Sequence, residues 1–175
     1  STFALFGEHQ IGLNAFGVGA LLGEVGIIAA IVQGLMIGKL TRRFGEVTLA
    51  NAGIFLMGVG LLVTTGAHSV LAMALVVPLY ALGSALTNPT MSALISKSTG
   101  ETRQGMTMGV AQGIGSFGRV LGPPVGTELF QAFSPAAPYF FGAALLGLTW
   151  LWSMLRLPRL AAEPIPIGNL VEVDA

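Results

Sequence analysis

The sequence contains no cysteine and very little charge. Only 9% of its 175 residues are charged, compared with about 25% in a typical soluble domain. The absence of cysteine excludes disulfides, thiolate metal sites and a cysteine nucleophile. The two histidines, His9 and His68, have no ligand-like spacing, so we expect neither a metal nor another cofactor. The formal net charge is zero, and this leaves no basic field that would attract nucleic acid.

What the sequence has in excess is apolar length. Hydrophobic residues make up 53% of the chain, which is too much for a soluble globule of this size. A bilayer core about 30 Å thick needs roughly 20 helical residues. Five segments reach that length, at residues 15–38, 47–66, 69–93, 104–127 and 137–157. We therefore expect an all-α membrane protein, a helical bundle with five full transmembrane spans in contact with the lipid bilayer.

The basic residues gather at alternate ends of these spans. The connections at residues 66–69 and 131–135 contain no Lys or Arg. Basic residues in short loops stay on the cytoplasmic side, so we expect the N-terminus outside and the C-terminus in the cytoplasm. Residues 161–175 contain two prolines that cannot continue a helix, which favours a disordered cytoplasmic tail. Seven of the eight basic residues follow the first, third or fifth span: Lys39, Arg42, Arg43, Lys97, Arg103, Arg156 and Arg159.

The chain begins at Ser1 without an initiator methionine, and residues 1–6 read like the end of another apolar helix. We expect the chain to be a fragment or a processed product of a longer protein. A half-size protein that dimerises is the alternative.

Glycines recur every four residues along the fourth span, a spacing that lets helix backbones approach closely in lipid. Pro123 and Pro124 interrupt this series, remove backbone donors and should bend the helix. A bent, glycine-lined helix suits either a moving helix pair or a static bundle. The glycines are Gly105, Gly109 and Gly113, followed one step out of register by Gly118, Gly122 and Gly126.

Two motifs give a family resemblance. Residues 34–46 resemble the signature loop of major facilitator superfamily transporters, with matches at Gly38, Leu40, Arg43, Phe44 and Gly45. Arg42 stands where the family has Asp, and Glu46 stands where it has a basic residue. The missing Asp favours the weaker copy of the loop, which follows the family's eighth helix. Residues 118–126 resemble a glycine-proline pattern of the family's proton-coupled drug exporters, and Asn88-Pro89 resembles their tenth helix.

The resemblance implies the C-terminal half of a twelve-helix fold, from the end of helix seven through helix twelve. It further implies a secondary active transporter in a bacterial inner membrane, exporting small amphipathic compounds or drugs in exchange for protons. The missing N-terminal half would be a partner, because the substrate cavity lies between two six-helix halves. Alternatives are a sugar or metabolite carrier of the same superfamily and a non-transporting membrane scaffold. The signature-loop residues Gly38, Arg42, Arg43 and Gly45 would form a conformational latch, or serve only as topology determinants.

Glu24 and Arg119 are the ionisable residues that lie well inside the predicted spans. Such groups are costly in lipid and mark a function or a partner. Their similar depth permits an ion pair, and Glu24 is the candidate proton-coupling group, because a carboxyl pKa responds to both burial and a neighbouring Arg. A static bridge is the alternative. Gln33, Asn88 and Gln112 are candidates for a substrate cavity or for hydrogen bonds between helices.

We expect no enzyme activity. Residues 113–118 match the G-x-G-x-x-G nucleotide fingerprint, but that motif requires a preceding strand, and here it lies inside an apolar span. Ser116 lacks the first glycine of a nucleophile elbow, and no histidine lies in any span.

Overall fold

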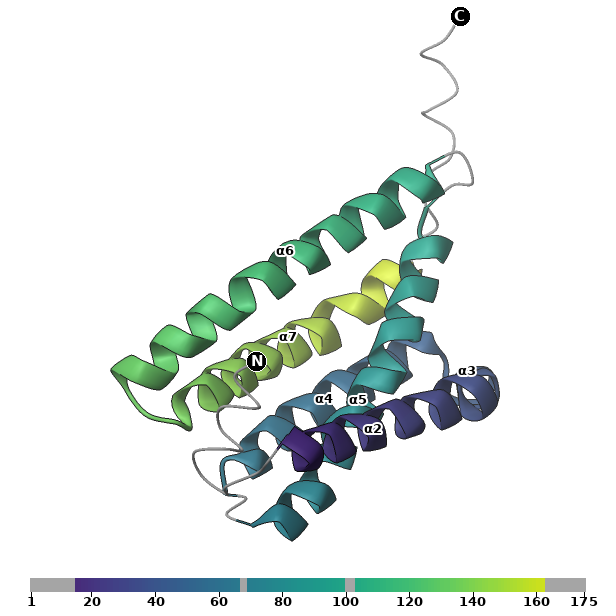
Figure 1. Cartoon of the computed structure of the whole chain (residues 1–175). Helices are drawn as coiled ribbons and strands as arrows, with labels where there is room; N and C mark the ends of the chain where they lie inside the picture. Colours follow the sequence, from purple (N-terminus) through teal and green to yellow (C-terminus); the bar gives the residue numbers. More distant parts are fainter. Residues whose placement is uncertain (1–14, 67–68, 100–102, 163–175) are drawn as a thin grey trace, which may run out of the picture.

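The computed structural model describes residues 15–66, 69–99 and 103–162. For Ala15 and residues 158–162 it describes the backbone but not the side chains. Within these ranges all regular structure is helical (Figure 1), which confirms the all-α prediction. The first helix is continuous from Phe16 to Phe44. It consists of α2 (Ala15–Ile31), a single π-helical stretch η1 (Val32–Met36) and α3 (Ile37–Phe44).

Four further helices follow: α4 (Glu46–Thr64), α5 (Val70–Lys97), α6 (Gln104–Ala132) and α7 (Ala137–Ala162). Each starts within one residue of a predicted span, and α3, α5, α6 and α7 all continue past the predicted ends. The last two residues of α7 belong to the predicted tail at 161–175, and the rest of that tail lies outside the described residues.

The number of apolar spans differs from the prediction. Four helices of the described chain are long and apolar enough to cross a membrane: Phe16–Phe44, Glu46–Thr64, Val70–Lys97 and Ala137–Leu157. The predicted span at 104–127 does form a long helix, α6, but α6 does not meet the same apolar standard. Its many glycines, together with Gln112 and Arg119, dilute the aliphatic residues. The expectation of five spans therefore holds for helix count and length, and for four of the five in apolar character.

The predicted signature loop is mostly helical. Residues up to Phe44 belong to the first helix, and α4 begins at Glu46, so Gly45 alone separates the two helices. Gly45 has a φ of 79°, the one positive φ among the described residues. Glycine adopts this conformation without the steric cost that a Cβ would bring. A single residue thus turns the chain back on itself.

Hydroxyl side chains within the helices bond to their own backbone. Thr64 Oγ1 donates to the Gly60 carbonyl at 2.7 Å, and Thr90 Oγ1 to the Leu86 carbonyl at 2.7 Å. These bonds satisfy polar groups in an apolar setting where water is absent. At the start of α5, Ser69 Oγ accepts a hydrogen bond from the Ala72 amide at 3.1 Å and so caps the helix.

The tightest helix contact lies between α4 and α5, not along the glycine series of α6. A Cβ on Gly83 would lie 2.6 Å from the Gly53 carbonyl oxygen, and one on Gly60 would lie 2.9 Å from the Tyr80 amide nitrogen. Small residues at these positions allow the two backbones to meet. Along α6, by contrast, a Cβ added to any of five glycines would have no neighbouring atom within 4 Å: Gly105, Gly109, Gly113, Gly118 and Gly122. Their predicted close packing is therefore not formed by the described helices.

Figure 1 shows α6 running alongside the other helices but set apart from them along most of its length. Most of its residues are exposed and none is buried. The buried cluster of the bundle joins Leu21 of α2, Met73 and Val77 of α5, and Tyr139 of α7. Large apolar side chains such as Leu71 and Phe16 are exposed on the outer surface, as expected for helices whose solvent is lipid.

Candidate functional site

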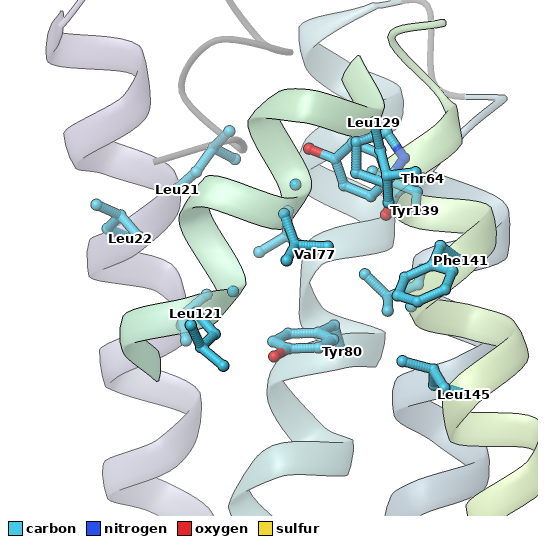
Figure 2. A pocket seen from close by; sticks show the side chains of 17 residues that line it. Leu21, Leu22, Thr64, Val77, Tyr80, Leu121, Leu129, Tyr139, Phe141 and Leu145 are labelled. Carbon is cyan, nitrogen blue, oxygen red and sulfur yellow. The ribbon is translucent and has the colours of Figure 1, made fainter. Parts of the chain in front are cut away.

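A cavity of about 710 Å³ lies between α6 and the rest of the bundle. Five helices contribute to its wall: α2, α4, α5, α6 and α7. Figure 2 shows side chains from several of these helices directed toward a common space, among them Leu21, Val77 and Phe141. The cavity exists because α6 stands off from the bundle. Gly122 and Gly126 form part of its α6 wall and, having no side chain, leave the space open.

The wall of this cavity is almost entirely aliphatic and aromatic. No charged side chain lines it, and the lining side chains that carry oxygen are Thr64, Tyr80 and Tyr139. The Thr64 hydroxyl donates to its own helix, so it offers a ligand only an acceptor. Tyr80 is partly exposed and Tyr139 is buried. A tyrosine in such a wall presents an apolar ring together with one polar handle. The site suits a largely apolar ligand with few polar groups.

The cavity lies toward the end of the bundle that carries no Lys or Arg. Its lining includes Thr64 at the end of α4, Leu129 near the end of α6 and Pro138 at the start of α7. The basic residues of α3, α5 and α7 lie at the opposite ends of their helices. Figure 1 shows these basic ends on the same side of the molecule. The structure thus separates an apolar cavity at one end from a basic surface at the other.

Glu24 and Arg119 flank the cavity without forming an ion pair. Glu24 is half-buried on α2 between the lining residues Leu22 and Val25, and Arg119 is exposed on α6, one turn before Gly122. The Arg119 Nη2 atom donates instead to Ser116 Oγ at 3.3 Å, along its own helix. The two charges do not meet because α2 and α6 are not among the closely packed helix pairs of this bundle. Their pairing and the proton-coupling role of Glu24 stay predictions.

The three uncharged polar candidates do not line the cavity. Gln33 lies in η1, Asn88 in α5 and Gln112 in α6, and all three side chains are exposed. The structure shows no hydrogen bond between any two of them. All three lie closer to the basic ends of their helices than the cavity does. Gln33 also lies in the π-helical stretch, a feature that often occurs at functional sites. Their role as cavity residues stays a prediction.

Among the residues around the predicted bend of α6, some line the cavity and others do not. Gly122 and Gly126 belong to the wall, whereas Gly118 and Pro123 do not. The helix continues without interruption through Pro123 and Pro124. A bend at Pro123 therefore stays a prediction.

The signature-loop residues lie around a second cavity, of about 570 Å³, at the basic end of the bundle. Gly38, Arg42 and Gly45 line it together with residues at the end of α5. Arg43 does not; its guanidinium carbon lies 5.5 Å from the centroid of the Phe44 ring. Lys97 Nζ of α5 lies 2.6 Å from Glu46 Oε1 of α4, the one ion pair among the described residues. Gln104 of α6 donates to Ser96 Oγ nearby.

Three features of the site were absent from the sequence prediction. The sequence identified Glu46 only as a departure from the signature loop. In the structure its carboxylate forms an ion pair with Lys97, the one ion pair among the described residues. An acidic residue at the start of α4 and a lysine at the end of α5 were the available signal, since the second predicted span starts on the side of the membrane where the third one ends. Tyr80 and Tyr139, and the Gly53–Gly83 contact, carried no signal beyond ordinary apolar composition.

Comparison with known proteins gives the family. The model of the Major Facilitator Superfamily matches residues 2–170 of the chain. No solved structure matches this one significantly. Among curated relatives, Multidrug resistance protein 1 of Bacillus subtilis (strain 168) is 30% identical over 148 residues, which cover 85% of this chain and 38% of the relative.

Two further relatives have comparable similarity. Multidrug resistance protein 2 of the same organism is 28% identical over 156 residues, covering 87% of this chain and 38% of the relative. Tetracycline resistance protein, class E, of Escherichia coli is 30% identical over 130 residues, covering 74% of this chain and 32% of the relative. The chain therefore spans well under half the length of these relatives. Because the family model matches nearly its whole length, the chain belongs to the Major Facilitator Superfamily.

Proposed function

We propose that this chain supplies part of the substrate pathway of a secondary active transporter that exports small amphipathic compounds or drugs. The apolar cavity beside α6 is the observation that carries the proposal. Its volume of about 710 Å³ falls within the range of roughly 300–1,000 Å³ that is typical of small-molecule sites. A mostly apolar wall with a few oriented polar groups is also typical of such sites.

The character of the wall favours an amphipathic substrate over a sugar. A sugar presents many hydroxyls, and each one buried without a partner costs free energy. The cavity offers side-chain oxygens from Thr64, Tyr80 and Tyr139 and no amide or charged group. The names of the relatives, which include multidrug and tetracycline resistance proteins, agree with this preference. A sugar or metabolite carrier is therefore the less favoured alternative.

Transport requires a second half, because superfamily transporters rock two helical halves about a central site near the bilayer midplane. The exposed polar residues Gln33, Asn88 and Gln112 face outward from this bundle and are available to such a half. We propose that the other half comes from the same, longer protein. Protons are the proposed counter-substrate, with Glu24 beside the cavity as the group that takes them up.

The alternation of basic and uncharged helix ends supports the orientation in the membrane. We propose that the protein resides in a bacterial inner membrane with its C-terminus in the cytoplasm. In this orientation the apolar cavity lies toward the outer side and the signature-loop residues lie toward the cytoplasm. We propose a transport role for this arrangement, not a catalytic one.

The cavity proposal is tested by ligand binding to matched glycine variants of α6. Gly122 lines the cavity and Gly118, one turn earlier, does not, and neither has a neighbouring atom where a Cβ would stand. The purified chain in lipid nanodiscs is titrated with a lipophilic fluorescent cation. Because Leu at position 122 fills space that the ligand needs, Gly122→Leu should weaken binding by about tenfold. Gly118→Leu should leave binding unchanged.

Equal binding by both variants would contradict the assignment of the cavity as the ligand site. A separate experiment distinguishes a transporter from a membrane scaffold. The intact transporter is reconstituted in vesicles with an imposed pH gradient, and efflux of the same dye is followed together with internal pH. Dye movement coupled to proton movement supports the proposal, whereas binding without any coupled flux supports the scaffold.

A further inference from the structure

The second cavity has the chemistry of an anion site. It lies where α3 and α5 end and α4 begins, and its polar lining consists of Thr41, Arg42, Glu46, Thr90 and Lys97. The Lys97–Glu46 ion pair is neutral overall. Arg42 is exposed and forms no ion pair with any described residue. The wall therefore carries one uncompensated positive charge.

The hydroxyl groups of the wall do not donate hydrogen bonds into the cavity. Thr41 Oγ1 donates to the Ile37 carbonyl at 2.7 Å, and Thr90 Oγ1 donates to the Leu86 carbonyl at 2.7 Å. Both hydroxyl protons are thus committed within their own helices. The donors available to a ligand are the guanidinium of Arg42, the ammonium of Lys97 and backbone amides.

Backbone amides reach the cavity at the start of α4. Gly45, at the rim, forms no side-chain cap on this 19-residue helix. The first amide of α4 bonded to a carbonyl of the turn is that of Leu49, which donates to the Gly45 oxygen at 3.2 Å. The amides of the preceding turn point out of the helix end, where the helix dipole favours an anion. The ends of α3 and α5 also place backbone carbonyl oxygens nearby, which would repel an anion. Two of these oxygens already accept hydrogen bonds: the Gly45 amide donates to the Thr41 oxygen at 2.9 Å, and the Ser98 amide donates to the Leu94 oxygen at 2.9 Å.

The rest of the wall is apolar and belongs to membrane-length helices. Ile37, Pro89 and Ala93 line the cavity beside the charged groups. A ligand held here would have its anionic group against Arg42 and apolar atoms against these side chains. Basic pockets between helices at the cytoplasmic edge of a membrane bind the head groups of anionic lipids. We propose that this cavity binds the phosphate group of an anionic membrane lipid, with Arg42 and the start of α4 as its main contacts.

Adjacent arginines provide a matched test. Arg42 lines the cavity, whereas Arg43 faces the Phe44 ring and does not. The 175-residue chain in phosphatidylcholine nanodiscs is titrated with short-chain phosphatidylglycerol, and bound lipid is counted by native mass spectrometry. Removing one interfacial charge should weaken binding by about fivefold in Arg42→Gln. Arg43→Gln has the same net charge as Arg42→Gln and should bind as the parent chain does.

Glu46→Gln gives the opposite sign. It removes the one carboxylate of the wall and frees Lys97, so it should tighten phosphatidylglycerol binding several-fold. If Arg42→Gln is not recovered folded, this variant and the charge-retaining Arg42→Lys decide the question. Unchanged binding in Glu46→Gln, or equal losses in Arg42→Gln and Arg43→Gln, would overturn the site.

Inorganic phosphate and glycerol phosphate identify the source of the phosphate group. For a lipid site, phosphatidylglycerol should bind more tightly than either soluble anion, because the apolar wall contacts its glycerol and acyl groups. Equal affinity for all three would assign the cavity to a soluble phosphate and overturn the lipid proposal. Equal binding of phosphatidylcholine and phosphatidylglycerol would overturn it as well, because the net charge would then have no effect.

Discussion

Lys97 Nζ and Glu46 Oε1 lie 2.6 Å apart and join the last turn of α5 to the first turn of α4. On the basic side of the bundle α4 begins and α5 ends, so the pair ties together two of the helices that frame the second cavity. The two partners differ in exposure, since the Lys97 side chain is 68% exposed and that of Glu46 is 16% exposed. The pair is therefore a partly shielded contact at the edge of the bundle.

This exposure limits how much the pair stabilises the fold. Exposed ion pairs contribute about 0.2–1 kcal/mol, and their contribution falls as salt rises. Lys97→Gln should lower the thermal unfolding midpoint in detergent only slightly, with a smaller effect at high salt. The charge-swapped pair Lys97→Glu with Glu46→Lys should recover part of the loss. A collapse of the fold in Lys97→Gln alone would show that the pair is essential, contrary to this expectation.

The contact between Gly53 and Gly83 should matter far more for stability. A Cβ on Gly83 would lie 2.6 Å from the Gly53 carbonyl oxygen and 2.7 Å from the Met57 amide nitrogen, atoms that cannot move cheaply. Gly83→Ala should therefore destabilise the bundle by about 1–3 kcal/mol through overpacking. Thermal unfolding in one detergent provides the measurement.

Gly109→Ala on α6 is the matched control. No atom lies within reach of its added Cβ, and alanine is the better helix former by about 1 kcal/mol. This variant should be neutral or slightly stabilised. If both alanine variants unfold at the same temperature, the α4–α5 contact is not as close as the structure shows.

The orientation in the membrane is open to direct labelling because the chain contains no cysteine. Ser98 follows α5 at the basic end, Ser134 lies between α6 and α7 at the other end, and both are exposed. A membrane-impermeant maleimide should label Ser134→Cys in intact cells and Ser98→Cys only after permeabilisation. The reverse pattern would invert the proposed topology and place the lipid site on the outer face.

The sequence predicted the helices well because their signals are local. Long apolar stretches and the charges between them fix where each helix begins, and all four helices from α4 to α7 start within one residue of the prediction. The basic loop was predicted less well, since residues up to Phe44 proved helical and only Gly45 turns the chain. The helix continues to Phe44 because the chain turns only at Gly45, through the backbone conformation of that one residue. A loop motif in the sequence does not predict where within the motif this turn occurs.

The site was harder to predict because it depends on how the helices are rotated and spaced. The 25 glycines of the chain offer many small-residue pairs, and only the fold selects Gly53 and Gly83. The cavity wall is built from ordinary apolar residues of five helices, and these are indistinguishable in sequence from lipid-facing ones. The similar depth of Glu24 and Arg119 in the membrane stays a prediction, and in this structure Arg119 bonds to Ser116 of its own helix instead of Glu24.

The separation of Glu24 and Arg119 leads to the sharpest prediction about coupling. Because the two are not paired in this conformation, the double variant Glu24→Gln with Arg119→Gln should change thermal stability by the sum of the single changes, within about 0.5 kcal/mol. If the charges pair when α6 closes on α2 during transport, the same variants should be non-additive in transport rate by about 0.5–3 kcal/mol. Additivity in both measurements would exclude an ion pair between Glu24 and Arg119 in either conformation.

The proposed proton-coupling role of Glu24 is tested by a separate measurement. Efflux of a fluorescent substrate by the intact transporter is measured with and without an imposed pH gradient. Glu24→Gln cannot exchange a proton, so it should retain substrate binding but lose the stimulation by the gradient. Glu128→Gln is the control, since Glu128 is exposed on α6 and does not line the cavity; it should respond to the gradient as the parent does. Full gradient dependence in Glu24→Gln would exclude this carboxylate as the coupling group, because a glutamine at this position cannot take up and release the proton that couples the gradient to the substrate.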